Sequence, residues 1–165
     1  GIDNILYAAK FCKDINFKLI GDGQLYEDMV SFSKKLKLEN VEFLGFMEKE
    51  QIAIELSKAH IGLGIFGTTD KAKRVIPNKA YEVMAVGLPL ITGNSPAARE
   101  ILVNKKHCIL CKMGSGKAIA NAILLLKNNE KLRKYISVEG HKLFSNLFST
   151  EAIGKLVEKI ILELL

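Results

Sequence analysis

Apolar residues follow two alternating patterns along this chain. In one pattern they recur every three or four positions, which is typical of a helix with one buried face. In the other they form short, nearly continuous runs, which is typical of strands buried on both sides of a parallel sheet. In the first half of the chain the helical pattern covers Ile2–Phe11, Leu25–Leu38 and Glu48–Ala59, and the strand pattern covers Phe17–Ile20, Val41–Leu44 and His60–Phe66.

The second half continues the alternation, with a polar loop at Gly67–Ile76 before its first helix. That helix is expected to open at Pro77 and to end near Gly87, because proline favours the first helical turn and glycine the position past the end. Beyond it the sequence predicts strands at Leu88–Thr92 and His107–Cys111, a loop with a short helix at Gly93–Val103, and helices at about Ser115–Asn128, Glu130–Phe148 and Thr150–Leu165. We expect the last of these helices to pack on the sheet, with packing against a partner domain as the alternative.

Strands that alternate with helices predict an α/β fold, in the form of a Rossmann-like, doubly wound parallel sheet with helices on both faces. The 165 residues match one domain of ordinary size, and no Pro/Gly-rich linker divides them. Ligands of such sheets bind beyond the carboxyl ends of the strands. The loops at that edge are expected at Gly21–Gly23, Gly45–Phe46, Gly67–Asn78 and Gly93–Ala97.

Composition excludes several classes of protein. Hydrophobic residues make up 48% and charged residues 25%, as in ordinary folded domains. No apolar stretch reaches the roughly 18–20 residues of a membrane span, and Gly1–Asn4 lack the pattern of a signal peptide. We interpret the net charge of +6 as a solvated lysine-rich surface, with attraction to a nucleoside diphosphate or an anionic lipid surface as the alternative. Nucleic acid is not expected as a partner, because the lysines are spread out and no nucleic-acid-binding motif is present.

The three cysteines lie at positions 12, 108 and 111. Cys108 and Cys111 have C-x-x-C spacing, but they fall in an apolar run that predicts a strand, whose period of two points their sulfurs to opposite faces. A metal site would need a second ligand pair, and the sequence offers none. We therefore expect small core residues, no bound metal and a reducing, cytoplasmic environment.

The strongest candidate chemistry lies at the start of the helix that Pro77 opens. The first free amides of that helix, near Asn78 and Lys79, would face the crevice and suit a diphosphate, and Lys79 adds a positive charge. Glu82 lies three residues after Lys79 and so on nearly the same face, where its carboxylate can accept hydrogen bonds from ribose hydroxyls. A solvated Glu82 paired with Lys79 is the alternative.

A weaker candidate is the turn Gly21-Asp22-Gly23, which lies between a strand and a helix. Exposed amides and the helix dipole at such a turn favour an anion. Tyr26 occupies the place of the third glycine of a dinucleotide fingerprint, so a plain glycine turn is the alternative and a dinucleotide oxidoreductase is not favoured.

The segment Pro77–Ile91, with the sequence PNKAYEVMAVGLPLI, is similar to the donor-site motif of glycosyltransferase family 4. Other segments resemble motifs of that family and stand in the same order: Leu19–Leu25, Val41–Phe46, Ala59–Leu63 and Ala98–Leu102. The resemblance implies one half of a GT-B fold, the C-terminal domain that binds a nucleoside-diphosphate sugar. It also implies that residues 1–165 are cut at the N-terminal edge of that domain and lack the acceptor-binding half.

The same resemblance implies transfer of a hexosyl group from that donor to a glycan or lipid-linked acceptor, with retention of configuration and without a metal or cofactor. Polysaccharide biosynthesis is the implied role, in the cytoplasm or peripherally at the inner face of an anionic membrane, and the chain alone is expected to be inactive. By position, Glu82 would hold the ribose, Pro77–Lys79 the diphosphate and Gly45–Phe46 the base, with Gly21–Gly23 lining the crevice.

Arg74 departs from the family pattern, because it stands where the family has a glutamate that contacts the transferred sugar. We interpret Arg74 either as a contact for phosphate or an acidic sugar, or as a solvated loop residue.

Two other function classes stay open. One is a related nucleotide-sugar enzyme such as an epimerase, which would need more carboxylates and a histidine in the crevice. The other is a non-catalytic nucleotide-binding module.

Overall fold

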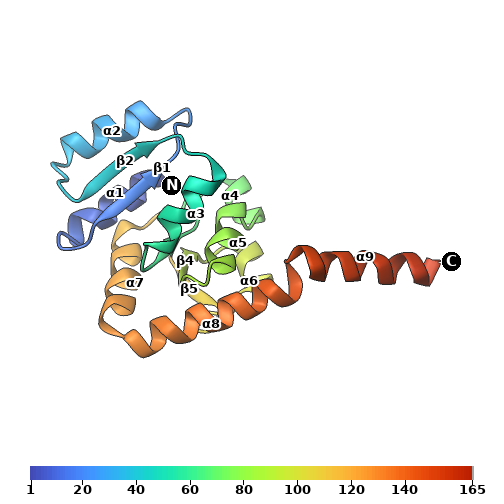
Figure 1. The fold of residues 1–165 in the computed structure, drawn as a ribbon. Helices are drawn as coiled ribbons and strands as arrows, with labels where there is room; N and C mark the ends of the chain where they lie inside the picture. Colours follow the sequence, from blue (N-terminus) through green and yellow to red (C-terminus); the bar gives the residue numbers. More distant parts are fainter. Residues whose placement is uncertain (165) are drawn as a thin grey trace.

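The computed structural model describes residues 1–164, in which helices alternate with strands (Figure 1). The strands are β1 (Phe17–Ile20), β2 (Val41–Gly45), β3 (Gly62–Leu63), β4 (Leu90–Gly93) and β5 (Cys108–Cys111). The helices are α1 (Ile2–Phe11), α2 (Tyr26–Lys35), α3 (Lys49–Ser57), α4 (Asp70–Arg74), α5 (Asn78–Ala85), α6 (Pro96–Ile101), α7 (Gly116–Asn128), α8 (Glu130–Leu147) and α9 (Thr150–Leu164).

All of these strands pair in parallel, which confirms the predicted fold class. β1 pairs with β2, while β3, β4 and β5 form a second sheet in that order. Within residues 1–164 no backbone ladder joins β1 to β3, so the sheet is in two parts. One hydrophobic cluster nevertheless crosses the division, since Phe17 of β1 belongs to the same buried cluster as Ile91 of β4 and Ile109 of β5.

Helices cover both faces of the three-stranded sheet. On one face, side chains of α1 and α7 join Ile91 and Ile109 in the first cluster. On the other face, side chains of α5, α6 and α8 surround Leu90 and Cys108 in a second cluster. The core is therefore a layered arrangement of helix, sheet and helix, as a doubly wound fold requires.

The cysteines are buried in this core. Cys111 lies in the first cluster and Cys108 in the second, which agrees with sulfurs on opposite faces of a strand. Burial raises the pKa of Cys108 to about 12 and that of Cys111 to about 11. Among residues 1–164 there is no group of three or more side chains that could hold a metal ion.

Two segments around β3 differ from the prediction. The apolar run His60–Phe66 forms a ladder only at Gly62–Leu63, because glycines weaken a strand and one edge of β3 has no partner in the described chain. The expected loop Gly67–Ile76 contains helix α4. Thr69 starts this helix by accepting a hydrogen bond from the Ala72 amide at 3.3 Å, a cap that the polar composition concealed.

The expectation that the last helix packs on the sheet is wrong. α9 extends away from the rest of the domain (Figure 1), and no residue of Thr150–Leu164 is buried. Its apolar stripe, which includes Ile153, Leu156 and Ile160, is exposed. Helical periodicity indicates which face of a helix is apolar, but not what covers that face. No helix within residues 1–164 is long and apolar enough to cross a membrane.

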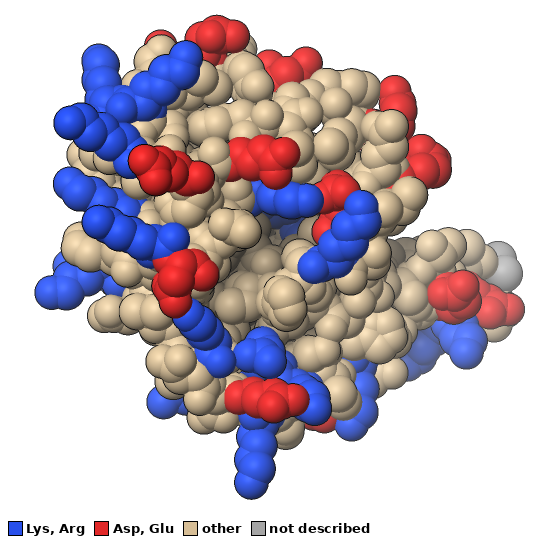
Figure 2. Space-filling model, turned by 60° about the vertical axis from the view of Figure 1, so that its left-hand side comes forward, with Lys and Arg blue, Asp and Glu red and all other residues tan. Residues whose placement is uncertain are grey.

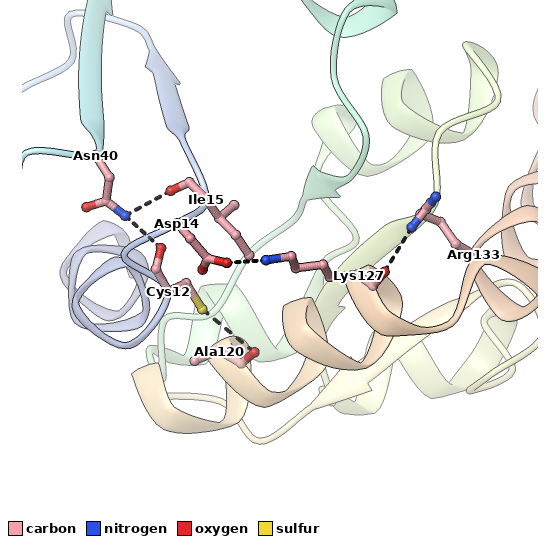
Figure 3. A network of polar contacts seen from close by, with 7 residues as sticks. All are labelled: Cys12, Asp14, Ile15, Asn40, Ala120, Lys127 and Arg133. Carbon is pink, nitrogen blue, oxygen red and sulfur yellow. Dashed lines mark hydrogen bonds and ion pairs between the residues drawn. The ribbon is translucent and has the colours of Figure 1, made fainter.

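A network of polar contacts fixes the amino ends of β1 and β2 (Figure 3). The Asn40 side-chain amide donates to the carbonyl oxygens of Ala9 at 3.2 Å, Cys12 at 2.8 Å and Ile15 at 2.8 Å. These contacts tie the loop between α1 and β1 to the start of β2. The carboxyl ends of the strands, where ligands of such sheets bind, lie at the other edge.

Candidate functional site

Helix α5 carries most of the predicted site residues, and a glycine in β3 determines its position. The buried face of α5 consists of Ala80, Val83 and Met84, and the exposed face includes Asn78, Lys79 and Glu82. A β-carbon at Gly62 would lie 2.4 Å from both γ-carbons of Val83, closer than real contacts allow. Glycine at this position therefore lets α5 lie directly on β3.

The carboxyl end of α5 is held by α8. Ser137 Oγ donates to the Gly87 carbonyl, and the imidazole Nδ1 of His141 lies 3.1 Å from the Met84 carbonyl oxygen. Gly87 has a φ of +69°, the left-handed conformation with which glycine commonly ends a helix. With β3 beneath it and α8 at one end, α5 presents its amino end to the loop that arrives from the carboxyl end of β3.

The amino end of α5 has no side-chain cap, unlike that of most neighbouring helices. At the starts of α4, α6, α7 and α8 a side chain accepts a hydrogen bond from a first-turn amide, and these caps are Thr69, Ser95, Ser115 and Asn129. Helices α1 and α2 lack such a cap, as α5 does. Pro77 begins α5 and offers no such group. The Ala80 amide donates to the Pro77 carbonyl at 2.9 Å. The amides of Asn78 and Lys79 come before it and have no acceptor within the helix.

The charge at this end of α5 is opposite to the usual arrangement. Helix dipoles favour acidic residues in the first turn, but α5 has none there and has Lys79 instead. Glu82 is exposed, and none of the ion pairs within residues 1–164 joins it to Lys79. Free amides beside an ammonium group favour an anion, while a carboxylate one turn away can accept hydrogen bonds from hydroxyl groups.

The structure also brings together two loops at the end of the two-stranded sheet. The Gly21 amide donates to the Gly45 carbonyl at 2.7 Å, which joins the turn Gly21–Gly23 to the loop that contains Phe46. Gly21 has a φ of +127° and Gly45 a φ of +65°, conformations that side chains disfavour. Asp22 is exposed, and the Phe46 ring is 65% exposed, available to a flat partner.

These loops follow β1 and β2 of one sheet, whereas the chain that leads to the amino end of α5 follows β3 of the other. No hydrogen bond within residues 1–164 joins the loops at Gly21 and Gly45 to the first turn of α5. The sequence predicts that both line one crevice. That assembly stays a prediction, whereas the arrangement within each group is described by the structure.

A cavity of about 690 Å³ lies between α4 and α6, and we call it the α4–α6 cavity. It is lined by Asp70, Lys73, Arg74, Pro96, Ala97 and Glu100. Of these residues, only Arg74 was a candidate from the sequence. The polar loop concealed α4, and the expected strand-end loop stopped at Ala97. The signal for Glu100 was the family-like segment Ala98–Leu102.

The surface charge agrees with a solvated lysine-rich surface. On the face shown in Figure 2, basic side chains are spread widely and acidic side chains lie between them. The basic side chains are densest along the left-hand edge of this view. On this face the basic side chains are thus not gathered at one groove.

Parallel sheets with helices on both faces and polar loops at the strand ends define a Rossmann-like α/β domain. Residues 1–143 match the family model of glycosyl transferases group 1. The chain belongs to this family of glycosyltransferases.

Two curated relatives illustrate the similarity. An uncharacterized glycosyltransferase of Methanocaldococcus jannaschii is 32% identical over 164 residues, which are 99% of this chain and 45% of the relative. The capsular polysaccharide biosynthesis glycosyltransferase CapM of Staphylococcus aureus is 35% identical over 83 residues, which are 50% of this chain and 22% of that protein. The chain therefore spans less than half the length of these relatives.

Solved structures confirm the fold. Anabaena HepE, solved in complex with UDP-glucose, has a TM-score of 0.85 at 19% identity, over 99% of this chain and 45% of that one. The C-terminal domain of the group 1 glycosyl transferase LpcC from Francisella tularensis has a TM-score of 0.72 at 21% identity, over 91% of this chain and 80% of that one.

Proposed function

We propose that this chain is the donor-binding half of a retaining glycosyltransferase and that it holds a nucleoside-diphosphate sugar at the amino end of α5. The observation that carries the proposal is the uncapped first turn of α5, which combines two unengaged amides, Lys79 and no acidic residue. A diphosphate would supply the missing acceptors and the missing negative charge.

The spacing along α5 fits the order of parts in such a donor. Glu82 lies four residues after Asn78, which corresponds to about 6 Å along a helix. A ribose bound by Glu82 would therefore lie next to a diphosphate bound by the Asn78 and Lys79 amides. We assign the base to the Gly45–Phe46 loop, with the Gly21–Gly23 turn, Asp22 included, beside it.

The same groups would act on the leaving group. When the bond between the sugar and the diphosphate breaks, negative charge develops on the diphosphate. Preorganised amides, the dipole of α5 and Lys79 would stabilise that charge without reorganisation. No residue of this chain is assigned as a nucleophile, and no metal or cofactor is invoked.

The relatives suggest the substrate class. HepE was solved with UDP-glucose, and CapM is named for capsular polysaccharide biosynthesis. We therefore propose a UDP-hexose-type donor and a glycan or lipid-linked acceptor. The acceptor would be held by the part of the full-length protein that lies outside this chain, at the inner face of a membrane when the acceptor is lipid-linked.

Calorimetric titration of the 165-residue chain with UDP, GDP and ADP tests donor binding. We expect one of the three nucleotides to bind, and UDP is the first candidate. Glu82→Ala should weaken that binding about tenfold, as loss of hydrogen bonds to a charged group does. Glu158→Ala removes an exposed mid-helix glutamate on α9 and is the matched control. A folded chain that binds none of the three nucleotides, or a Glu82→Ala variant with unchanged affinity, contradicts the proposal.

The chain alone should not transfer sugar, because the acceptor would be held elsewhere. A coupled assay for UDP release, with and without acceptor glycans, measures this. Turnover by the isolated chain would overturn the assignment of the acceptor site to another part of the protein.

A further inference from the structure

The end of α4, which lines the α4–α6 cavity, leads directly into the amino end of α5, where the diphosphate is proposed to bind. If Glu82 binds the ribose and the first turn of α5 binds the diphosphate, the sugar extends past the amino end of α5, toward the residues that precede Pro77. Arg74 lies three residues before Pro77 and lines the cavity. The cavity, with a volume of about 690 Å³, is widely open to solvent, so a ligand held there would stay partly exposed.

The charges that line this cavity are not all paired. Lys73 Nζ lies 3.4 Å from Asp70 Oδ1, so these two charges offset one another. Arg74 Nε donates to the backbone carbonyl of Asp70 at 3.3 Å, which positions the guanidinium but leaves its charge uncompensated. None of the ion pairs within residues 1–164 involves Arg74 or Glu100. Arg74 and Glu100 thus line the same cavity, each without a close ion-pair partner in the described chain.

We propose that Arg74 selects a donor whose sugar carries a carboxylate, as a uronic acid does. The inference rests on the proposed function and names the sugar class of the same site. The Nη edge of the guanidinium can donate two parallel hydrogen bonds to a carboxylate, a bidentate geometry that the planar arginine side chain favours. Glu100 accepts hydrogen bonds from the sugar hydroxyls.

A neutral hexose satisfies this pair of side chains less well. Its hydroxyls can donate to Glu100, but they offer Arg74 only neutral acceptors. Hydrogen bonds between neutral and charged groups are weaker than those in which both partners are charged. A uronic acid keeps the hydroxyls for Glu100 and adds a charged partner for Arg74. The difference between the two sugars is therefore expected in affinity for the sugar and not in affinity for the nucleotide.

The test is calorimetric titration of the chain with UDP, UDP-glucose and UDP-glucuronate. We expect UDP-glucuronate to bind at least about tenfold more tightly than UDP-glucose, a difference in affinity that matches the strength of hydrogen bonds to charged groups. Arg74→Ala should abolish this preference and leave UDP affinity unchanged. Arg74→Glu should reverse the preference, because a second carboxylate repels the uronate. Arg74 is exposed, so both variants should fold, which circular dichroism and thermal melting verify.

Lys71→Ala is the matched control, since Lys71 is an exposed cation of the same helix that does not line the cavity. It should retain the preference for UDP-glucuronate. Equal affinity for the two sugar nucleotides overturns the proposal. So does an Arg74→Ala variant that weakens UDP and both sugar nucleotides alike, because Arg74 then acts on the diphosphate. A chain that binds no uridine nucleotide contradicts the proposed function itself, and the inference falls with it.

Discussion

The side chain of Asn40 should be worth a measurable part of the stability of this domain. Its amide nitrogen has two hydrogens and contacts carbonyl oxygens at 3.2, 2.8 and 2.8 Å, so it forms about two hydrogen bonds at a time. The Ala9 carbonyl also accepts from the Cys12 amide, and the Cys12 carbonyl from the Ile15 amide. These carbonyls keep a partner when Asn40 is removed, which moderates the loss.

At about 0.5–1.5 kcal/mol for each hydrogen bond, Asn40→Ala should cost about 2 kcal/mol. For a domain of this size, 1 kcal/mol shifts Tm by about 2–4 °C, so we expect a decrease of about 4–8 °C. Thermal melting followed by circular dichroism measures the shift. UDP affinity should not change, because Asn40 lies at the amino ends of the strands and the proposed site at the carboxyl ends.

Asn16→Ala is the matched control. Asn16 is exposed in the loop between α1 and β1 that Asn40 contacts, and its side chain forms no hydrogen bond in the described structure. Asn40→Asp gives a second test, because a carboxylate would face carbonyl oxygens. At neutral pH it should destabilise the domain more than alanine does. Repulsion by the carbonyl oxygens would raise the pKa of the carboxyl in the folded state, so the difference should shrink as the pH falls toward about 4, where the carboxyl is protonated in the folded state. Equal Tm values for Asn40→Ala and Asn16→Ala would refute the reasoning.

Three further predictions concern a glycine, an ion pair and the cysteines. Gly62→Ala should displace α5, lower the free energy of unfolding by about 1–3 kcal/mol and weaken nucleotide binding. Adding Val83→Ala to the same chain should recover part of this loss. If the stability changes of the two substitutions simply added up, the packing argument would be contradicted. Hydrogen bonds from two lysines lower the pKa of Glu55 from 4.5 to about 2. Glu55→Gln should therefore have a lower Tm than the natural chain at pH 7, and the difference in Tm should close as the pH falls from 4.5 toward 2. A difference in Tm that persists at pH 2 would show that it does not come from the charge of Glu55. Burial and raised pKa values should keep Cys108 and Cys111 unreactive toward a thiol reagent at pH 8 until the domain unfolds, and rapid labelling of the native protein would be the contrary result.

The fold class could be predicted because the apolar patterns are dictated by burial on both sides of each strand. Most helix positions followed for the same reason, and Pro77 and Gly87 marked the limits of α5 correctly within one or two residues. The extent of β3 could not be predicted, since an apolar run does not reveal whether a neighbouring strand is present to pair with it. The position of α9 was missed because its amphipathic pattern is independent of what covers it.

The candidate site could be predicted only in part, for a related reason. Loops at strand ends are local features, and the sequence indicated Lys79 and Glu82 through helical spacing together with the family-like segment Pro77–Ile91. The α4–α6 cavity depends on how two short helices approach one another across the sheet edge. Neither the absence of a cap on α5 nor the offset of Lys73 by Asp70 can be inferred without the three-dimensional arrangement.

If α5 binds the donor as proposed, its two faces separate folding from recognition. Ala80, Val83 and Met84 belong to the core, whereas Asn78, Lys79 and Glu82 contribute nothing to it. Substitutions on the exposed face can therefore alter what the domain binds at little thermodynamic cost, while the buried face holds the helix in place. Such a division leaves substrate preference free to diverge over evolutionary time on an unchanged scaffold.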